Sequence, residues 1–205
     1  MRQLVLPPNE TVHRLIPDPP LTDEQYFAFC SANSSLTIER TASGELIVMA
    51  PAGAESAYRS NEVCRQLTNW ALQDGRGVAF DSSVEFLLPT GAALSPDASW
   101  VKRTKLAKLT HEQLRRFPPI APDFVVEVLS PSDRLPAAQA KMQDWLDAGV
   151  PLAWLIDTDR RTVYVYRRSE PFETYHDIES LAAPDPLPGF TLHLTAIWQG
   201  LRPTS

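Results

Sequence analysis

Short apolar runs alternate with polar helical stretches along this chain, a pattern that predicts a mixed α/β fold. The run 124–129 is almost continuously apolar, which is typical of a strand buried on both faces. Apolar residues recur at three- and four-residue spacing over 55–73 and 136–148, and predict two amphipathic helices. The segments 36–49 and 152–166 each hold two strand-like runs around a polar turn, and predict hairpins.

Weaker patterns predict further elements around this core. Thr22-Asp23-Glu24 is a helix-start signal for a helix over 21–31. We also expect a polar helix or insertion at 105–117 and strands at 78–80, 84–89, 98–101 and 187–194. Residues 1–20 are rich in proline and are expected to form an extended arm, so that residues 21–205 form a single domain without internal repeats.

Composition, net charge and cysteine spacing indicate which broad class of protein this chain belongs to. The chain is 43% hydrophobic and 21% charged, which is ordinary for a globular domain. A net charge of −6 argues against loose, charge-driven coating of nucleic acid, but not against a local basic groove. Cys30 and Cys64 form no spacing motif and are expected to be free thiols. No apolar run approaches a membrane span and no signal peptide is visible, so we expect a cytoplasmic protein.

Two acidic residues carry the first hint of chemistry. Glu127 lies inside the apolar run 124–129, where an unpaired carboxylate is costly. Asp97 follows a proline and precedes the strand expected at 98–101. If these strands are neighbours, both carboxylates face one point, and Mg²⁺ or Mn²⁺ prefers oxygen ligands. We therefore expect a metal held by Asp97, Glu127 and a backbone carbonyl, for which Val128 is the candidate.

A lysine follows these acids on the next helix. Lys141 lies near the start of the helix expected at 136–148. A lysine at a metal site orients the attacking water and offsets charge in phosphoryl transfer. The plainer alternatives are a solvated lysine, a turn or cap aspartate at Asp97, and a Glu127 paired with an arginine.

The Pro96-Asp97 and Glu127 arrangement resembles the PD-(D/E)XK nuclease superfamily. Over residues 20–200 the order of short motifs more closely resembles the Uma2 family of restriction-endonuclease-like proteins. The matching pieces are Glu39-Arg40 with Gly44-Glu45-Leu46, Ser95-Pro96-Asp97, Pro122-Asp123 through Asp133, Lys141 through Val150, Trp154 through Asp157, and Leu187 through Phe190. The resemblance implies a restriction-endonuclease-like core, with flanking helices and additional β-hairpins, that hydrolyses DNA with Mg²⁺.

Two departures from the family pattern affect the candidate site. The superfamily lysine normally lies two residues after the glutamate, where this chain has Leu129. The Uma2 pattern places a lysine on the following helix instead, and Lys141 matches it. Many members carry a histidine where the first long helix begins; here Glu55 lies in that region and is expected to act as a third acidic group. Its alternative is a first-turn glutamate favoured by the helix dipole.

Other polar residues are weaker candidates. Glu39 faces the same cleft if its strand is suitably oriented, and Gln139 precedes Lys141 by two residues. Lys102, Arg103 and Lys105 follow Asp97 and are the expected phosphate contacts, with a solvated basic face as the alternative.

Two other functions fit the same sequence. One is a catalytically inactive nuclease fold that binds DNA or protein, and the other is a nuclease acting on RNA or branched DNA. Convergence of Asp97, Glu127 and Lys141 in space separates an enzyme from a binding module. Because cutting both strands of a duplex often needs two sites, the resemblance also allows a homodimer.

Overall fold

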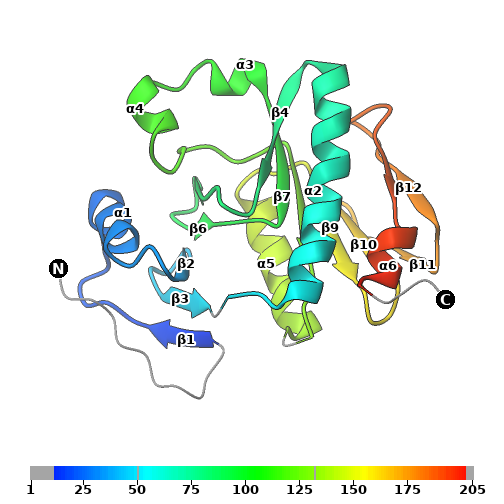
Figure 1. Cartoon of the computed structure of the whole chain (residues 1–205). Coiled ribbons are helices and arrows are strands. Elements are labelled where there is room, and N and C mark those ends of the chain that lie inside the picture. Colours follow the sequence, from blue (N-terminus) through cyan, green and yellow to red (C-terminus); the bar gives the residue numbers. More distant parts are fainter. Residues whose placement is uncertain (1–11, 50, 132, 202–205) are drawn as a thin grey trace.

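The computed structural model of the chain describes residues 12–49, 51–131 and 133–201. A six-stranded mixed sheet lies between two long helices, and a smaller five-stranded sheet lies beside it (Figure 1). The large sheet has the order β11-β10-β9-β8-β7-β4. Its strands are β4 (Gly77–Asp81), β7 (Ala98–Lys102), β8 (Phe124–Val128), β9 (Leu152–Asp157), β10 (Thr162–Arg167) and β11 (Glu173–His176). The α/β class predicted from the sequence is confirmed.

Only one neighbouring pair in the large sheet, β8 and β9, is parallel, and helix α5 (Leu135–Asp147) connects them. Successive side chains of β8 point to opposite faces of the sheet, so each packs against only one of the two long helices. Phe124, Val126 and Val128 pack in the core beneath the other long helix, whereas Val125 packs in the core that contains α5. Because side chains two apart share a face of a strand, Glu127 faces α5 together with Val125.

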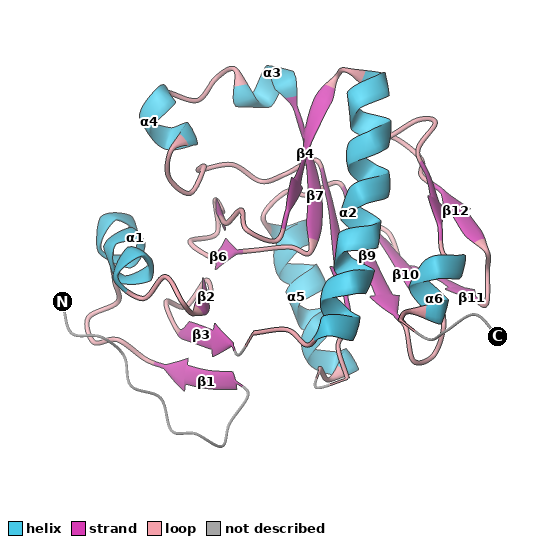
Figure 2. Cartoon of the chain, in the orientation of Figure 1, coloured by secondary structure: helices cyan, strands magenta, loops and turns pink. Residues whose placement is uncertain are grey.

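Helix α2 (Ala54–Asp74) covers the opposite face of the large sheet (Figures 1 and 2). It buries Val63, Leu67 and Ala71 at three- and four-residue spacing, as its sequence predicts. Its C-cap is Gly75 in the left-handed conformation, φ 73°. Helix α6 (Thr195–Gln199) and the separate two-stranded sheet of β12 (Ser180–Ala182) and β13 (Thr191–His193) extend this layer.

The five-stranded sheet has the order β1-β3-β2-β6-β5, and every pair in it is antiparallel. Its strands are β1 (Val12–Leu15), β2 (Thr37–Arg40), β3 (Leu46–Met49), β5 (Phe86–Leu87) and β6 (Ala93–Leu94). Helix α1 (Asp23–Ala32) packs on it through Tyr26, against Ile38 and Val48. Residues 12–15 of the expected N-terminal arm thus form an edge strand, and residues 1–11 lie outside the described residues.

Some predicted elements are shorter than expected. The strand expected at 84–89 is reduced to β5, and the helix expected at 105–117 is two single turns, α3 (Arg103–Leu106) and α4 (His111–Leu114). Thr110 is the N-cap of α4 and forms a capping box with Gln113. A new helix therefore begins at this point, and α3 does not continue through it. Across the described part of the chain, no helix is both long and apolar enough to cross a membrane.

Candidate functional site

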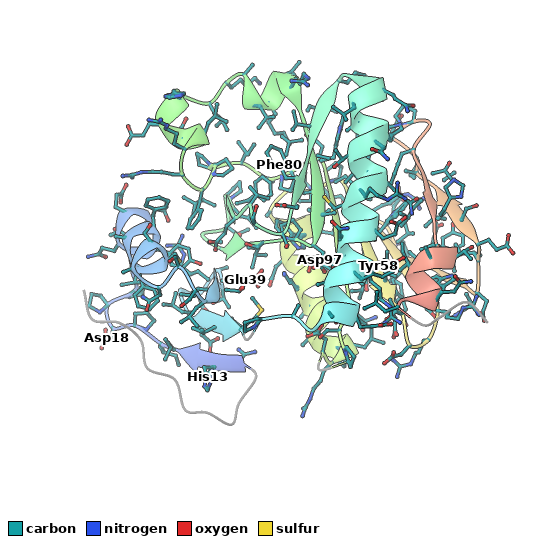
Figure 3. The ribbon with its side chains drawn as sticks, in the orientation of Figure 1. His13, Asp18, Glu39, Tyr58, Phe80 and Asp97 are labelled. Atoms are coloured by element: carbon teal, nitrogen blue, oxygen red, sulfur yellow. The ribbon has the colours of Figure 1, made fainter. Side chains whose placement is uncertain are left out.

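Asp97 and Glu127 lie at the same end of the large sheet. Ala98 of β7 is paired with Val126 of antiparallel β8, so the next position along each strand brings Asp97 opposite Glu127. Asp97 Oδ2 accepts a hydrogen bond from the Val128 amide at 2.7 Å, and Oδ1 accepts one from the Ser60 hydroxyl of α2 at 3.0 Å. The sequence suggests the Val128 carbonyl as a metal ligand. In the structure, the Val128 N–H donates to Asp97 and so orients its carboxylate. Figure 3 labels Asp97 beside α2.

Helix α5 supplies the partners of Glu127. Lys141 Nζ lies 2.9 Å from Glu127 Oε1, and the indole Nε1 of Trp145 donates to the same oxygen at 2.9 Å. Trp145 follows Lys141 by one helical turn, so both side chains point to the face of β8 that carries Glu127. Trp145 falls on a periodic apolar position of this helix, which indicates a core residue, and it is fully buried. In the sequence, Trp145 follows Lys141 by four residues, which places the two side chains on the same face of the helix. This spacing could have indicated that Trp145 also contacts the site.

Three acceptors surround the ammonium group of Lys141. Besides Glu127, it donates to Glu39 Oε1 at 2.8 Å and to the Ser95 carbonyl at 3.0 Å. Glu39, on β2 of the small sheet, is 5% exposed. An ammonium has three N–H donors and no lone pair, so these contacts occupy it completely. The structure therefore brings together Asp97, Glu127, Lys141 and Glu39 from four different elements of the chain.

Burial and neighbouring charges together set the pKa values of this cluster. Burial raises the pKa of Asp97, and it raises the pKa of Glu127 to about 8, with the charges of Asp97 and Glu39 acting in the same direction and Lys141 against them. Burial alone would lower the pKa of Lys141, but the carboxylates of Glu127 and Glu39 outweigh it and raise that pKa. These carboxylates therefore favour the ammonium form of Lys141.

The donor set fits a hard divalent cation. When ionised, Glu39, Asp97 and Glu127 carry three negative charges against the single positive charge of Lys141, an excess that an added cation would offset. Each Asp97 oxygen accepts one hydrogen bond, and no described residue donates to Glu127 Oε2. Within the described residues, however, no three His, Cys, Asp or Glu side chains are grouped to hold an ion, so a metal here would take two carboxylates and complete its shell with backbone or water oxygen.

Two predicted site residues make their contacts elsewhere. Glu55, in the first turn of α2, pairs with Arg59 at 2.9 Å and accepts a hydrogen bond from the Leu201 amide at 3.2 Å. Gln139 lies near Tyr166 of β10, where it lowers the pKa of a hydroxyl that burial raises, but the described residues offer that hydroxyl no hydrogen-bond partner. Among the described contacts, neither residue touches Asp97, Glu127 or Lys141.

The expected phosphate-binding residues lie at the opposite end of β7 from Asp97. The five residues of β7 separate Asp97 from Arg103, so the two lie six positions apart, a span of about 20 Å. Lys102 and Arg103 are exposed there, whereas Lys105 pairs with Asp123 at 3.1 Å and donates to the Ala121 carbonyl. Asp123 immediately precedes β8 and accepts a hydrogen bond from the Lys102 amide at 2.9 Å, so it contacts the end of β7 and not the Asp97 site.

Comparison with known proteins bears on the fold and the family of this chain. One solved structure, described as "a putative nuclease belonging to DUF820" from Anabaena variabilis ATCC 29413, is similar with a TM-score of 0.66 and 20% identity over 80% of this chain and 90% of that chain. At this identity the likeness shows the fold alone. No curated protein sequence matches the chain. The model of the Uma2 family, described as "Putative restriction endonuclease", matches residues 23–195. This match spans most of the chain and includes Asp97, Glu127 and Lys141, and the protein therefore belongs to the Uma2 family, which indicates a nuclease.

Proposed function

We propose that the protein is a Mg²⁺-dependent endonuclease that hydrolyses phosphodiester bonds in DNA. The observation that carries the proposal is the convergence of two partly buried carboxylates, Asp97 and Glu127, with the ammonium of Lys141. Hard cations are held by such oxygen pairs, and phosphoryl transfer needs positive charge near the phosphate.

In this proposal Asp97 and Glu127 would hold the metal ion. The ion would polarise a phosphoryl oxygen and lower the pKa of a bound water. Ser60 and the Val128 amide fix the orientation of Asp97, and Trp145 fixes that of Glu127. Lys141 supplies a permanent positive charge that offsets the negative charge growing on the phosphate, and its raised pKa argues against a role as general base.

The same geometry weighs against a fold used only for binding. Charged groups buried together cost desolvation energy, and apolar replacements of similar volume are often as stable or more stable. A module that bound DNA through its surface would gain nothing from Lys141 enclosed by Glu39 and Glu127. The cluster is better explained by chemistry that needs it.

A substrate panel tests the proposal. Wild-type protein is incubated with supercoiled plasmid, linear duplex, branched DNA and single-stranded RNA, each with Mg²⁺, with Mn²⁺ or with EDTA. We expect nicked or linear plasmid with either metal and intact plasmid with EDTA. Cleavage confined to RNA or to branched DNA would correct the substrate, and plasmid cleavage in EDTA would remove the metal from the proposal.

A further inference from the structure

We infer that Glu39 is a positioning residue of this site, which holds Lys141 and the Asp97 segment in their working arrangement from outside the nuclease core. The inference rests on the proposed function for its catalytic meaning, but its structural content is independent of it. Glu39 is on β2 of the small sheet, 58 positions before Asp97 and 102 before Lys141 in the sequence. Figure 3 labels Glu39 and Asp97 in the region between the small sheet and α2.

A single oxygen of Glu39 serves both groups. Oε1 accepts the Ser95 amide at 2.9 Å and the Lys141 ammonium at 2.8 Å. The Ser95 carbonyl accepts a second N–H of Lys141 at 3.0 Å. Glu39, Ser95 and Lys141 thus form a closed ring of three hydrogen bonds. Ser95 lies two residues before Asp97, so this ring also fixes the segment that carries the proposed metal ligand.

The ring leaves the third N–H of Lys141 outside it, and Glu127 Oε1 lies 2.9 Å from the same nitrogen as an ion-pair partner. Two of three donors are held by groups that have no proposed contact with metal or substrate. The lysine therefore keeps its position when the contacts of Glu127 change, and its remaining N–H stays directed at the reacting centre. Without Glu39, the flexible four-carbon stem of Lys141 would have only the Ser95 carbonyl to hold it away from Glu127.

Burial makes the contact strong. Glu39 is 5% exposed, and the side chain of Lys141 is 23% exposed. A charged pair in such surroundings is screened far less than one on the surface, and losing one partner leaves the other charge buried. The small sheet is thereby linked to the activity of the large one through one ion pair.

The first test observes Lys141 directly, without cleavage. The chain contains only four lysines, Lys102, Lys105, Lys108 and Lys141. In protein labelled with ¹⁵N-lysine, the ammonium protons of Lys141 should exchange slowly with water and give a resolved signal, assigned by its loss in Lys141→Arg. Glu39→Gln keeps an oxygen at the acceptor position but removes the charge. We expect at least tenfold faster exchange of that signal, with no change in Glu45→Gln, a matched glutamate that immediately precedes β3 and pairs with Arg14.

The second test uses plasmid cleavage and a double-mutant cycle. We expect Glu39→Gln to lower kcat about tenfold and Glu39→Ala at least a hundredfold, with KM for DNA within twofold of wild type. In a Lys141→Arg background, Glu39→Gln should cause less than a twofold further loss, because Glu39 acts through Lys141. A folded Glu39→Gln protein with unchanged ammonium exchange overturns the inference, as does equal loss in both backgrounds. An inactive wild type with the expected exchange pattern would instead reject the proposed function and leave the Glu39–Lys141 arrangement in place.

Discussion

Glu127 Oε1 accepts the indole N–H of Trp145 at 2.9 Å, and Lys141 Nζ lies 2.9 Å from the same oxygen. One turn of α5 thus provides both a neutral donor and a cation to a carboxylate on β8. The indole also packs in the core on this face of the sheet, so the position of Glu127 is tied to the packing of α5. A residue that belongs to the core by its burial is in this way part of the candidate site.

Trp145→Phe should reveal this second role. The variant keeps most of the apolar contact and removes one hydrogen bond to a carboxylate, which is worth about 1.5–3 kcal/mol when the acceptor is charged. Because the pKa of Glu127 is about 8, the loss in unfolding free energy should be greater at pH 9 than at pH 6. Urea unfolding at both pH values measures it. Trp70→Phe, a change on α2 remote from Glu127, should show no such dependence on pH; equal pH dependence in both variants would contradict the account.

Lys141→Met should destabilise the protein as well as inactivate it. It leaves Glu39 and Glu127 without their cation, and breaking a buried pair costs about 3–5 kcal/mol. Lys108→Met removes an exposed lysine and should change the unfolding free energy by no more than about 0.5 kcal/mol. Chemical denaturation of the two variants beside wild type gives the comparison. Equal stability of both variants would mean that the Lys141 contacts contribute little.

The buried acid Glu85 predicts an unusual dependence of stability on pH. Burial raises its pKa from 4.5 to about 8, and the Tyr26 hydroxyl lies 2.5 Å from its Oε1. Between these two pH values the folded protein retains a proton that the unfolded chain has released. Stability should therefore fall as pH rises from 4.5 towards 8, by a few kcal/mol at about 1.4 per pKa unit.

Glu85→Gln isolates this contribution, because glutamine resembles the protonated acid. The variant should match wild type near pH 5 and be more stable than wild type at pH 9. Thermal unfolding over this pH range measures the difference between the two proteins, so that the titration of Glu127, common to both, cancels. Parallel stability curves for wild type and variant would show that Glu85 does not titrate in this way.

Gly77 allows a sharp test of the packing beneath α2. A Cβ added at this position would lie 2.1 Å from Cε2 of the Trp100 indole, which is completely buried. Gly77→Ala should lower the unfolding free energy by about 3 kcal/mol, since the indole has no free space to move into. Gly53→Ala, where nothing lies within 4 Å of the new methyl group, should cost no more than about 1 kcal/mol at this helix cap. Similar melting temperatures for the two variants would contradict this packing.

The sequence predicts the large sheet better than it predicts the site. The apolar run around Glu127 and the helical periodicity around Lys141 are local signals, and both elements form where expected. The single acid in that run also indicates a carboxylate enclosed by core. Strand length alone could have shown that Lys102 lies far from Asp97, because four residues of β7 lie between them.

The supporting residues have no comparable local signal. Ser60 and Ser95 acquire their roles from contacts with Asp97 and with Glu39 and Lys141, made between distant parts of the chain. Glu55 shows the opposite case, a residue with a sequence signal but no contact with the site. Its position in the family pattern suggested a site residue, whereas its contacts in the structure are with Arg59 and Leu201. Such pairings depend on tertiary packing, which neither periodicity nor a short motif specifies.

The most direct test of the central claim is metal-dependent cleavage of supercoiled plasmid by wild type, Asp97→Asn and Asp81→Asn, measured side by side with Mg²⁺ and Mn²⁺. Asp81 is an exposed aspartate on β4, the edge strand that pairs with β7, and it lies opposite Ala98, so it is a nearby control carboxylate that makes no proposed contact with the metal. The account predicts nicked plasmid with wild type and Asp81→Asn, and at least a hundredfold slower nicking with Asp97→Asn that retains its fold by circular dichroism. Equal cleavage by all three proteins would contradict the assignment of Asp97, and intact plasmid with every protein and metal would contradict the nuclease itself.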